Sequence, residues 1–202
     1  MTETTAILLA AGQSTRMGAQ NKLLLEINGV PMIRHIVEQY QSAIDGPVLV
    51  VLGHEEKLVK AALDGTGADT VFNADFAEGQ FTSVATGLRN AVDAETVLIG
   101  LGDQPLLRHK DITALLTSHR VANPGKISIP VNEGARGNPL VVPRSLRARL
   151  LEDPKKPGCQ KFTRTHPELV QELPLQSPGL FIDVDTPEDF QTQCLSIKAI
   201  DA

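Results

Sequence analysis

The segment at residues 6–25, AILLAAGQSTRMGAQNKLLL, limits the possible folds of this chain more than any other. Its aliphatic start suits a buried strand, and the small residues AAG follow at once. Because no bulky side chain intervenes, backbone N–H groups in such a turn can approach a ligand closely. Arg16 can fork two phosphate oxygens, and Lys22 adds a compact positive charge. The segment therefore predicts a strand that runs into a loop for a triphosphate, although its glycine spacing is neither that of a Walker A loop nor that of a dinucleotide fold.

The length and composition fit one globular domain. The 202 residues are 42% hydrophobic and 21% charged, which suits a sizeable core. A net charge of −5 disfavours the basic surface of a nucleic-acid-binding protein. No apolar stretch is as long as a membrane span, and the first residues lack the basic and then apolar pattern of a leader. We therefore expect a cytoplasmic protein with neither nucleic acid nor membrane among its partners.

Strand and helix signals alternate over the first 130 residues. Pro31 suits the first position of a helix whose apolar residues recur at helical spacing as far as Tyr40. The order favours a single doubly wound α/β sheet, mostly parallel and Rossmann-like, with helices on both faces. The other predicted elements are strands at residues 5–9, 47–52, 70–72, 96–101 and 126–129, and helices at residues 54–63, 81–92 and 110–119.

The alternation breaks after residue 130. Strands are predicted there at residues 137–142, 169–173 and 181–184, helices at 143–151 and 187–197, and a loop at 153–158. No repeat or interdomain linker interrupts the sequence, so we expect one domain over residues 1–202. Within it, we expect a nucleotide-binding part at about residues 1–105 and an acceptor-binding part at about 106–202.

A second motif, GLGDQPLL, places Asp103 directly after a predicted central strand. In open α/β sheets, ligands bind beyond the carboxyl ends of the strands. A carboxylate there can hold Mg²⁺, which prefers oxygen ligands and substrate phosphates. The alternative is an aspartate that only caps a turn before Pro105, and the phosphate loop favours the metal.

A third motif, FIDVDTPED at residues 181–189, offers two more carboxylates. Asp183 and Asp185 alternate along an extended segment, so they should point to opposite faces, and only one is expected to reach the Asp103 site. Asp185 or Thr186 suits the N-cap of the last helix, with a proline at its first position. Because capping accounts for Asp185, Asp183 is predicted as the second metal ligand.

Two glycine-containing loops complete the set. Residues 73–88 run from a short strand through Gly79 into a helix whose first turn holds Ser83. Free N–H groups at a helix start can bind an anion or a base carbonyl, although serine is also a common N-cap. The turn GARGNP at residues 134–139 can follow the contour of an acceptor, and its Arg136 can pair with a phosphate. A plain hairpin turn with an exposed arginine fits those residues equally well.

The two cysteines, Cys159 and Cys194, form no metal-binding motif. A disulfide is not expected in a reducing compartment. Cys159 is predicted in a polar loop, where either a reactive thiol or an inert one fits.

Together these blocks resemble the MobA-like nucleotidyltransferases, and over most of the chain they are most similar to the molybdenum cofactor cytidylyltransferase branch. The similar motifs are LAAG-x-S-x-R-M-G, G-x-x-x-S-V, GDQP, G-x-R-G-N-P and D-V-D-T-P-E-D, in this order. The LAAG opening is closer to that branch than to the guanylyl-transferring one, which more usually reads LAGG. The stretch KKPGCQKF departs from the family on the acceptor side and leaves the acceptor open.

The resemblance implies Mg²⁺-dependent transfer of CMP from CTP to the phosphate of molybdopterin or the molybdenum cofactor, with a molybdoenzyme as a further partner. It implies catalytic roles for Arg16, Lys22 and Asp103. The implied nucleotide-binding residues are Leu9, Ala10, Ala11, Gly12, Arg16, Lys22, Asn73, Gly79, Ser83 and Asp103. The implied acceptor-binding residues are Gln104, Arg136, Gly137 and Asn138, and the metal ligands are Asp103 and Asp183.

In the implied reaction, an acceptor phosphate oxygen attacks the α-phosphorus of CTP and pyrophosphate leaves. The acceptor is already ionised, so no general base is needed, in agreement with a sequence that shows no Ser/His/Asp or Cys/His arrangement. Catalysis then depends on the metal and the cations. The alternatives are guanylyl transfer to molybdopterin, transfer to a sugar or alcohol phosphate, a non-catalytic cofactor-binding chaperone, and a recruited fold that performs redox chemistry on a bound nucleotide cofactor.

Overall fold

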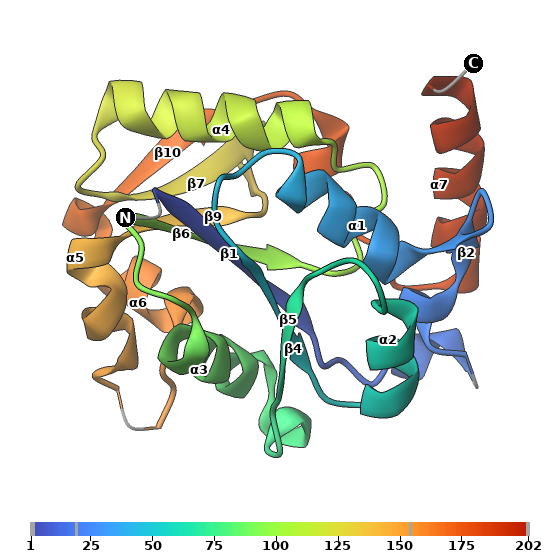
Figure 1. Cartoon of the computed structure of the whole chain (residues 1–202). Coiled ribbons are helices and arrows are strands. Elements are labelled where there is room, and N and C mark those ends of the chain that lie inside the picture. The colour runs from blue at the N-terminus through green and yellow to red at the C-terminus, as the bar shows by residue number, and fades with distance from the viewer. Residues whose placement is uncertain (1–2, 19, 154, 201–202) are drawn as a thin grey trace.

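The protein has a central β-sheet with helices packed against both faces, as Figure 1 shows. The computed structural model describes residues 3–18, 20–153 and 155–200, with side chains as far as residue 197. Ala19 of the predicted phosphate loop and Pro154 of the predicted 153–158 loop lie outside the described residues. Within the described part, no helix combines the length and the apolar character needed to cross a membrane.

In the described residues, eight strands form the main sheet in the order β10-β7-β9-β6-β1-β4-β5, with β8 paired to β7. β1 pairs in parallel with β4 and β6, and the pairs β4–β5 and β7–β10 are also parallel. β9 lies antiparallel between β6 and β7. The strands are β1 (Thr4–Ala10), β4 (Val48–Leu52), β5 (Asp69–Phe72), β6 (Thr96–Leu101), β7 (Ile127–Asn132), β8 (Ala135–Arg136), β9 (Leu140–Pro143) and β10 (Val170–Pro174), and a separate ribbon consists of β2 (Glu26–Ile27) and β3 (Val30–Pro31).

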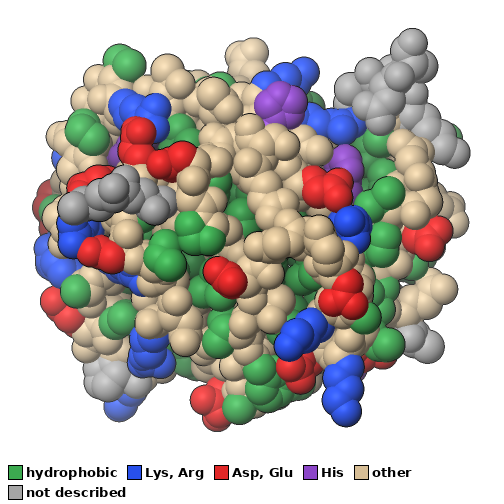
Figure 2. All heavy atoms as spheres, in the orientation of Figure 1, with side chains coloured by type: hydrophobic (Ala, Val, Ile, Leu, Met, Phe, Trp, Pro, Cys, Tyr) green, Lys and Arg blue, Asp and Glu red, His purple; other side chains and the backbone are tan. Residues whose placement is uncertain are grey.

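The helices surround this sheet. The α-helices are α1 (Met32–Gln41), α2 (Glu56–Ala62), α3 (Gln80–Asn90), α4 (His109–Ala122), α5 (Arg144–Arg147), α6 (Cys159–Thr165) and α7 (Pro187–Ile200). Short 3-10 helices are η1 (Thr15–Met17), η2 (Lys22–Leu24), η3 (Phe76–Glu78), η4 (Ala148–Leu151), η5 (Pro167–Leu169) and η6 (Pro178–Leu180). In Figure 1, α3, α5 and α6 lie together on one side of the sheet, and α1 and α4 lie on the other. Acidic and basic side chains are interspersed over the face in Figure 2.

Each face of the sheet has its own apolar core, because successive residues of a strand point to opposite faces. Ala6 and Leu8 of β1 pack with residues of α1, α2 and α4. Ile7, between them, packs with residues of α3, α5 and α6 on the other face. Burial on both faces also explains the continuous aliphatic run of β4, in which every residue is buried. The prediction of a mostly parallel, doubly wound α/β sheet is confirmed.

The direction of winding changes at β1. From β1 the chain moves outward through β4 to β5, and α3 returns it to β6 on the other side of β1. Such a switch point leaves a crevice beyond the carboxyl ends of the two strands, where ligands bind in open α/β folds. Here those ends are Ala10 of β1 and Leu101 of β6.

The predicted helical position of Pro31 is wrong. Pro31 pairs with Glu26 in the ribbon of β2 and β3, and α1 begins one residue later at Met32. Its ψ of 136° is extended, so the proline ends the ribbon instead of opening the helix.

The strand predicted at residues 181–184 is also absent from the described structure. The N–H groups of Phe181 and Ile182 donate to the Pro178 carbonyl, which makes a turn. The N–H of Val184 then donates to the Asp103 carbonyl at 2.9 Å. These loop contacts use the donors that a strand ladder would need, and they bring the segment across the end of β6.

Candidate active site

The loop after β1 leads into a polar cavity at the switch point. Gly53, just after β4, packs so closely against this loop that a Cβ on it would lie 2.7 Å from the Ala11 carbonyl oxygen. The N–H of His54 donates to the same carbonyl at 3.3 Å, so the end of β4 fixes the turn. This polar cavity, called the first cavity from here on, has a volume of about 400 Å³. The predicted nucleotide-binding residues that line it are Leu9, Ala10, Ala11, Gly12, Arg16, Lys22, Ser83 and Asp103.

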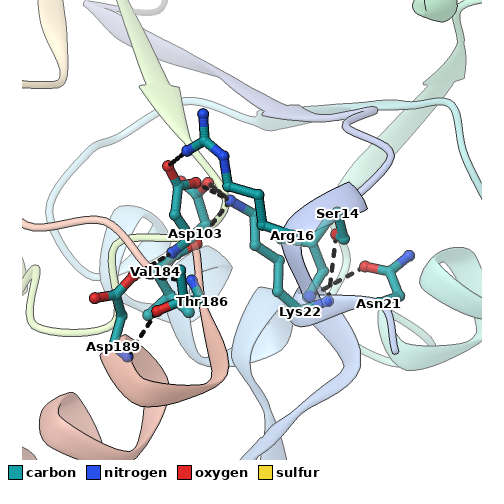
Figure 3. A network of polar contacts seen from close by, with 10 residues as sticks. Ser14, Arg16, Asn21, Lys22, Asp103, Val184, Thr186 and Asp189 are labelled. Atoms are coloured by element: carbon teal, nitrogen blue, oxygen red, sulfur yellow. Dashed lines mark hydrogen bonds and ion pairs between the residues drawn. The ribbon is translucent and has the colours of Figure 1, made fainter. Parts of the chain in front are cut away.

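Lys22 is held by several contacts at the wall of this cavity. It begins η2, where the Asn21 carboxamide accepts a backbone N–H at 3.1 Å. Its Nζ lies 2.6 Å from Asp103 Oδ2 and 3.0 Å from Asp185 Oδ1, and it donates to the Val184 carbonyl at 2.7 Å (Figure 3). The lysine side chain is 13% exposed and that of Asp103 is 16% exposed, so this pair is largely shielded from water.

The site perturbs the pKa values of both partners. Burial by itself would lower the pKa of Lys22, but the charges and hydrogen bonds of Asp103 and Asp185 outweigh it, so the pKa is raised. Burial raises the pKa of Asp103 against the lowering by Lys22, and the charge of Asp183 raises it further. Since burial and a negative neighbour both disfavour the ionised form of Asp103, a further cation bound there would be stabilised.

Three carboxylates meet beside Lys22. Asp103, Asp183 and Asp185 each offer an oxygen, and these atoms lie within 4.8 Å of one another. Asp103 Oδ1 is buried without a hydrogen-bond partner among the described residues. Carboxylate oxygens with an unsatisfied buried atom suit a hard divalent cation, so the residues fit the predicted metal. The expectation that only one of Asp183 and Asp185 reaches the site is wrong, because the segment is not a strand and does not alternate.

The start of α7 explains why Asp185 is available. Thr186 Oγ1 accepts the N–H of Asp189 at 3.2 Å, and Asp189 Oδ2 accepts the N–H groups of Asp185 and Thr186 at 3.1 and 2.8 Å. This reciprocal capping box makes Thr186 the N-cap. The Asp185 carboxylate instead meets Arg16, whose Nη1 lies 2.5 Å from Asp185 Oδ2 (Figure 3). The T-x-x-D spacing at residues 186–189 is the sequence signal that could have identified Asp185 as a site residue.

Asn73 supports the cavity but is not among its lining residues. It is buried, and its Nδ2 donates to the hydroxyls of Thr82 and Ser83 at 2.8 and 3.0 Å. Its Oδ1 accepts the N–H of Asp75 at 3.1 Å. These bonds fix the loop that leads into α3, and they place Ser83 on the cavity wall. Direct contact of Asn73 with a nucleotide stays a prediction.

A second cavity, of about 600 Å³, adjoins the first. The two share Leu9, Gln80 and Leu101, so they meet at the ends of β1 and β6. The predicted acceptor residues Arg136, Gly137 and Asn138 line the second cavity, as does Gly79. Gly137 lies so close to η6 that a Cβ on it would be 2.3 Å from the Leu180 carbonyl oxygen.

Two predictions on the acceptor side are affected by burial. Gln104 is 1% exposed, its Nε2 donates to the Leu180 carbonyl at 3.3 Å, and it lines neither cavity. Its role toward an acceptor stays a prediction. The polar loop predicted around Cys159 is wrong, because Cys159 begins α6 and is buried in the wall of the second cavity. Burial raises the pKa of this thiol to about 12, which makes it unreactive at neutral pH.

The sequence prediction missed several residues of both cavities. In the first cavity these include Ser14, Thr15, Phe76 and Gln80. In the second they include Lys156, Lys161 and Arg164. Nothing in the local pattern distinguishes these residues from ordinary loop and surface residues, and only the folded chain brings them together.

A loop of small residues at a switch point, beside a carboxylate cluster, suits an enzyme that handles a metal-bound nucleoside triphosphate. Comparison with known proteins agrees with this class. The chain belongs to the MobA-like NTP transferase domain family, whose model matches residues 6–170.

Curated relatives extend over most of the chain. Nicotine blue oxidoreductase from Paenarthrobacter nicotinovorans is 30% identical over 192 residues, which cover 91% of this chain and 93% of the relative. The bifunctional protein GlmU from Campylobacter curvus is 32% identical over 184 residues, covering 86% of this chain. The match spans only 41% of the length of GlmU.

Solved structures share the fold. A nucleotidyl transferase from Methanothermobacter thermautotroptrophicus has a TM-score of 0.81 at 22% identity, with 96% of this chain and 99% of that one covered. Rv0371c from Mycobacterium tuberculosis, in a complex with manganese, has a TM-score of 0.74 at 23% identity, covering 96% and 100%. A CMP:2-keto-3-deoxy-manno-octonic acid synthetase complexed with CTP has a TM-score of 0.72 at 18% identity, covering 99% and 100%. The family supports a nucleotidyltransferase with a nucleoside triphosphate substrate, and these solved structures share the fold.

Proposed function

We propose that this protein is a Mg²⁺-dependent nucleotidyltransferase that transfers CMP from CTP to the phosphate of molybdopterin or the molybdenum cofactor and releases pyrophosphate. The observation that carries the proposal is the junction of the two cavities at Leu9, Gln80 and Leu101. One cavity has the phosphate loop and the carboxylates, and the other has the GARGNP turn. Two substrates bound there would meet at the shared wall, as direct transfer requires.

The cations of the first cavity suit the departing pyrophosphate. Arg16 and Lys22 exchange their carboxylate partners for phosphate oxygens when the triphosphate binds. Lys22 then stabilises the charge that develops around the α-phosphate and the leaving group. Asp103, with Asp183 and Asp185, would hold the Mg²⁺, which when bound neutralises phosphate oxygens.

The acceptor needs positioning more than deprotonation. A monophosphate is ionised at neutral pH, so its oxygen can attack without a general base. The described lining of the two cavities includes no histidine, in keeping with this chemistry. Gly137 and Asn138 would contact the acceptor, and Arg136 would pair with its phosphate. A complex with a molybdoenzyme that receives the product belongs to the same proposal.

The test combines pure protein and Mg²⁺ with each of CTP, GTP, ATP and UTP, and with molybdopterin or its molybdenum form. We expect pyrophosphate release with CTP and a product whose mass is that of the acceptor plus CMP. A GMP adduct would establish guanylyl transfer instead. Activity only with sugar or alcohol phosphates would change the acceptor, and tight acceptor binding without any product would favour a chaperone.

A matched pair of variants tests the metal site. Asp103→Asn should abolish Mg²⁺-dependent turnover while the thermal midpoint stays close to that of the parent. Asp69→Asn, which removes an exposed carboxylate on β5 outside both cavities, should leave turnover unchanged. Full activity of Asp103→Asn would eliminate the metal assignment.

A second candidate is redox chemistry on a bound nucleotide cofactor. The specific observation is the match to nicotine blue oxidoreductase, which extends over nearly the whole of both chains. The sequence lacks a dinucleotide glycine fingerprint, which places this candidate second. Oxidation of NADH or NADPH by the protein with candidate pigments, in the absence of any triphosphate, would favour it over transfer.

A further inference from the structure

The second cavity is lined by four cations, and the proposed transfer assigns a role only to Arg136. Arg136, Lys156, Lys161 and Arg164 line this cavity, and Glu78 is the one acidic residue among its described lining residues. The whole chain has a net charge of −5, so the cavity reverses the balance of the protein. A local excess of cations in an acidic protein indicates an anionic ligand.

Two of these four cations are available for a ligand. Lys156 and Arg164 have no ion pair among the described residues. The other two are already paired with the carboxylates of Glu172 and Asp153. An unpaired cation has no carboxylate partner that a ligand must displace. Lys156 and Arg164 are therefore the groups to which a ligand anion would bind first.

The chain holds Lys156 in position through Asp153. Asp153 Oδ1 accepts the N–H groups of Lys155 and Lys156 at 2.9 and 3.1 Å. Its Oδ2 accepts from Lys161 Nζ on α6 at 2.5 Å. This turn is therefore tied to the helix that also bears Arg164, and both free cations face the same cavity.

Neither Lys156 nor Arg164 lines the first cavity. Lys156 also lines a third cavity of about 280 Å³, which shares no described lining residue with the first. Leu9, Gln80 and Leu101, by contrast, are shared with the first cavity and mark the reacting end. Much of the remaining wall is apolar and includes Phe81, Val84, Ile99, Ile129 and Leu140.

We propose that Lys156 and Arg164 form an anion subsite for an acceptor that carries a second negative group, separated from its reacting phosphate by an apolar or aromatic body. This inference rests on the proposed transfer, because that reaction places the acceptor phosphate at the junction. A small sugar monophosphate would leave both the apolar wall and the free cations unused. A longer acceptor with two anionic ends would contact the junction, the apolar wall and the two free cations.

The turnover-independent test uses 8-anilinonaphthalene-1-sulfonate, whose rings and sulfonate match the apolar wall and the two free cations. The double variant Lys156→Gln/Arg164→Gln should weaken the binding of this probe at least about tenfold, because hydrogen bonds to charged groups are commonly worth that much each. Lys155→Gln is the matched control, since Lys155 lines none of the three cavities. The affinity for CTP should be the same in all three proteins, which also shows that the variants are folded.

The kinetic arm measures KM for the acceptor and for CTP. We expect a rise of about tenfold or more in the acceptor KM of the double variant, with the KM for CTP unchanged. Unchanged probe affinity together with an unchanged acceptor KM overturns the subsite while leaving the transfer intact, and an equal loss in Lys155→Gln also overturns it. If the wild type transfers to no acceptor but probe binding still depends on Lys156 and Arg164, the proposed function fails and the anion subsite stands.

Discussion

Replacing Lys22 by methionine tests whether the site is held together by charge in the absence of substrate. Methionine keeps most of the length and apolar volume of the stem and removes the ammonium group. The loss leaves Asp103, Asp185 and the Val184 carbonyl without the donor that lies 2.6, 3.0 and 2.7 Å from them. The carboxylates would then repel one another around a single cavity.

The expected cost follows from how deeply the pair is buried. Removing one partner of a fully buried ion pair costs about 3–5 kcal/mol. Here Lys22 and Asp103 are 13% and 16% exposed and Asp185 is 42% exposed, so water compensates part of the loss. We expect a decrease of about 2–3 kcal/mol in the free energy of unfolding, between the values for partly and fully buried pairs. For a domain of this size that corresponds to a fall of roughly 5–10 °C in Tm.

The assay is urea and thermal unfolding by circular dichroism, with a chelator present and no nucleotide. The pKa of Asp103 is already raised, and removing Lys22 should raise it further. The loss of stability in Lys22→Met should therefore become smaller as the pH falls below the pKa of Asp103, because the protonated carboxyl carries no charge to compensate. The double variant Lys22→Met/Asp103→Asn should recover part of the loss, because the uncompensated charge is gone. Lys110→Met on α4 is the control. An unchanged Tm in Lys22→Met, or strictly additive effects in the double variant, would show that charge does not hold the site together.

Three further outcomes are expected. Asp189→Ala should weaken Mn²⁺ binding about 10–100-fold in calorimetric titration, because its carboxylate holds the N–H groups of Asp185 and Thr186; an unchanged Kd would contradict this. Tyr40→Phe should raise the free energy of unfolding in urea by about 1–2 kcal/mol, because the fully buried hydroxyl has no partner among the described residues, and a destabilised variant would show that the hydroxyl makes a hydrogen bond in solution. The pKa of Asp45 is lowered by the N–H groups of Glu3 and Thr4, so its stabilisation is present above the ordinary value of ~4 and is lost as the pH falls below it. Asp45→Asn should therefore lose less Tm than the wild type between neutral and acid pH, and equal losses would remove Asp45 from the acid response.

The half of the site that lies in one contiguous segment could be predicted from the sequence. The loop after β1 and the cations Arg16 and Lys22 are within thirteen positions of Ala10, so a single short segment brings them to the same cavity. The strands could be predicted equally well, because a strand buried on both faces is a run of aliphatic residues, as in β4. Asp103 could be predicted because it follows such a run.

The remainder depends on contacts between distant residues. The sequence predicts that Gln104 contacts the acceptor. Its amide N–H instead donates to the carbonyl of Leu180, which is 76 positions away in the chain. The alternation that separated Asp183 from Asp185 assumed a strand, and Val184 instead bonds to the backbone of Asp103. Cys159 looked exposed among polar neighbours, and only the packing of α6 buries it. In each case the local pattern suited a polar or extended segment, and a distant partner determined the outcome.

The segment that joins η6 to α7 also sets the order in which the parts of the candidate site come together during synthesis. Asp185 meets Arg16 from 169 positions further along the chain. A ribosome therefore delivers the phosphate loop long before the carboxylates at 183 and 185 leave the exit tunnel. The carboxylate cluster is complete only when this late segment lies across the end of β6, where the N–H of Val184 donates to the Asp103 carbonyl. The three carboxylates therefore come together only after residues 183–185 have been synthesised.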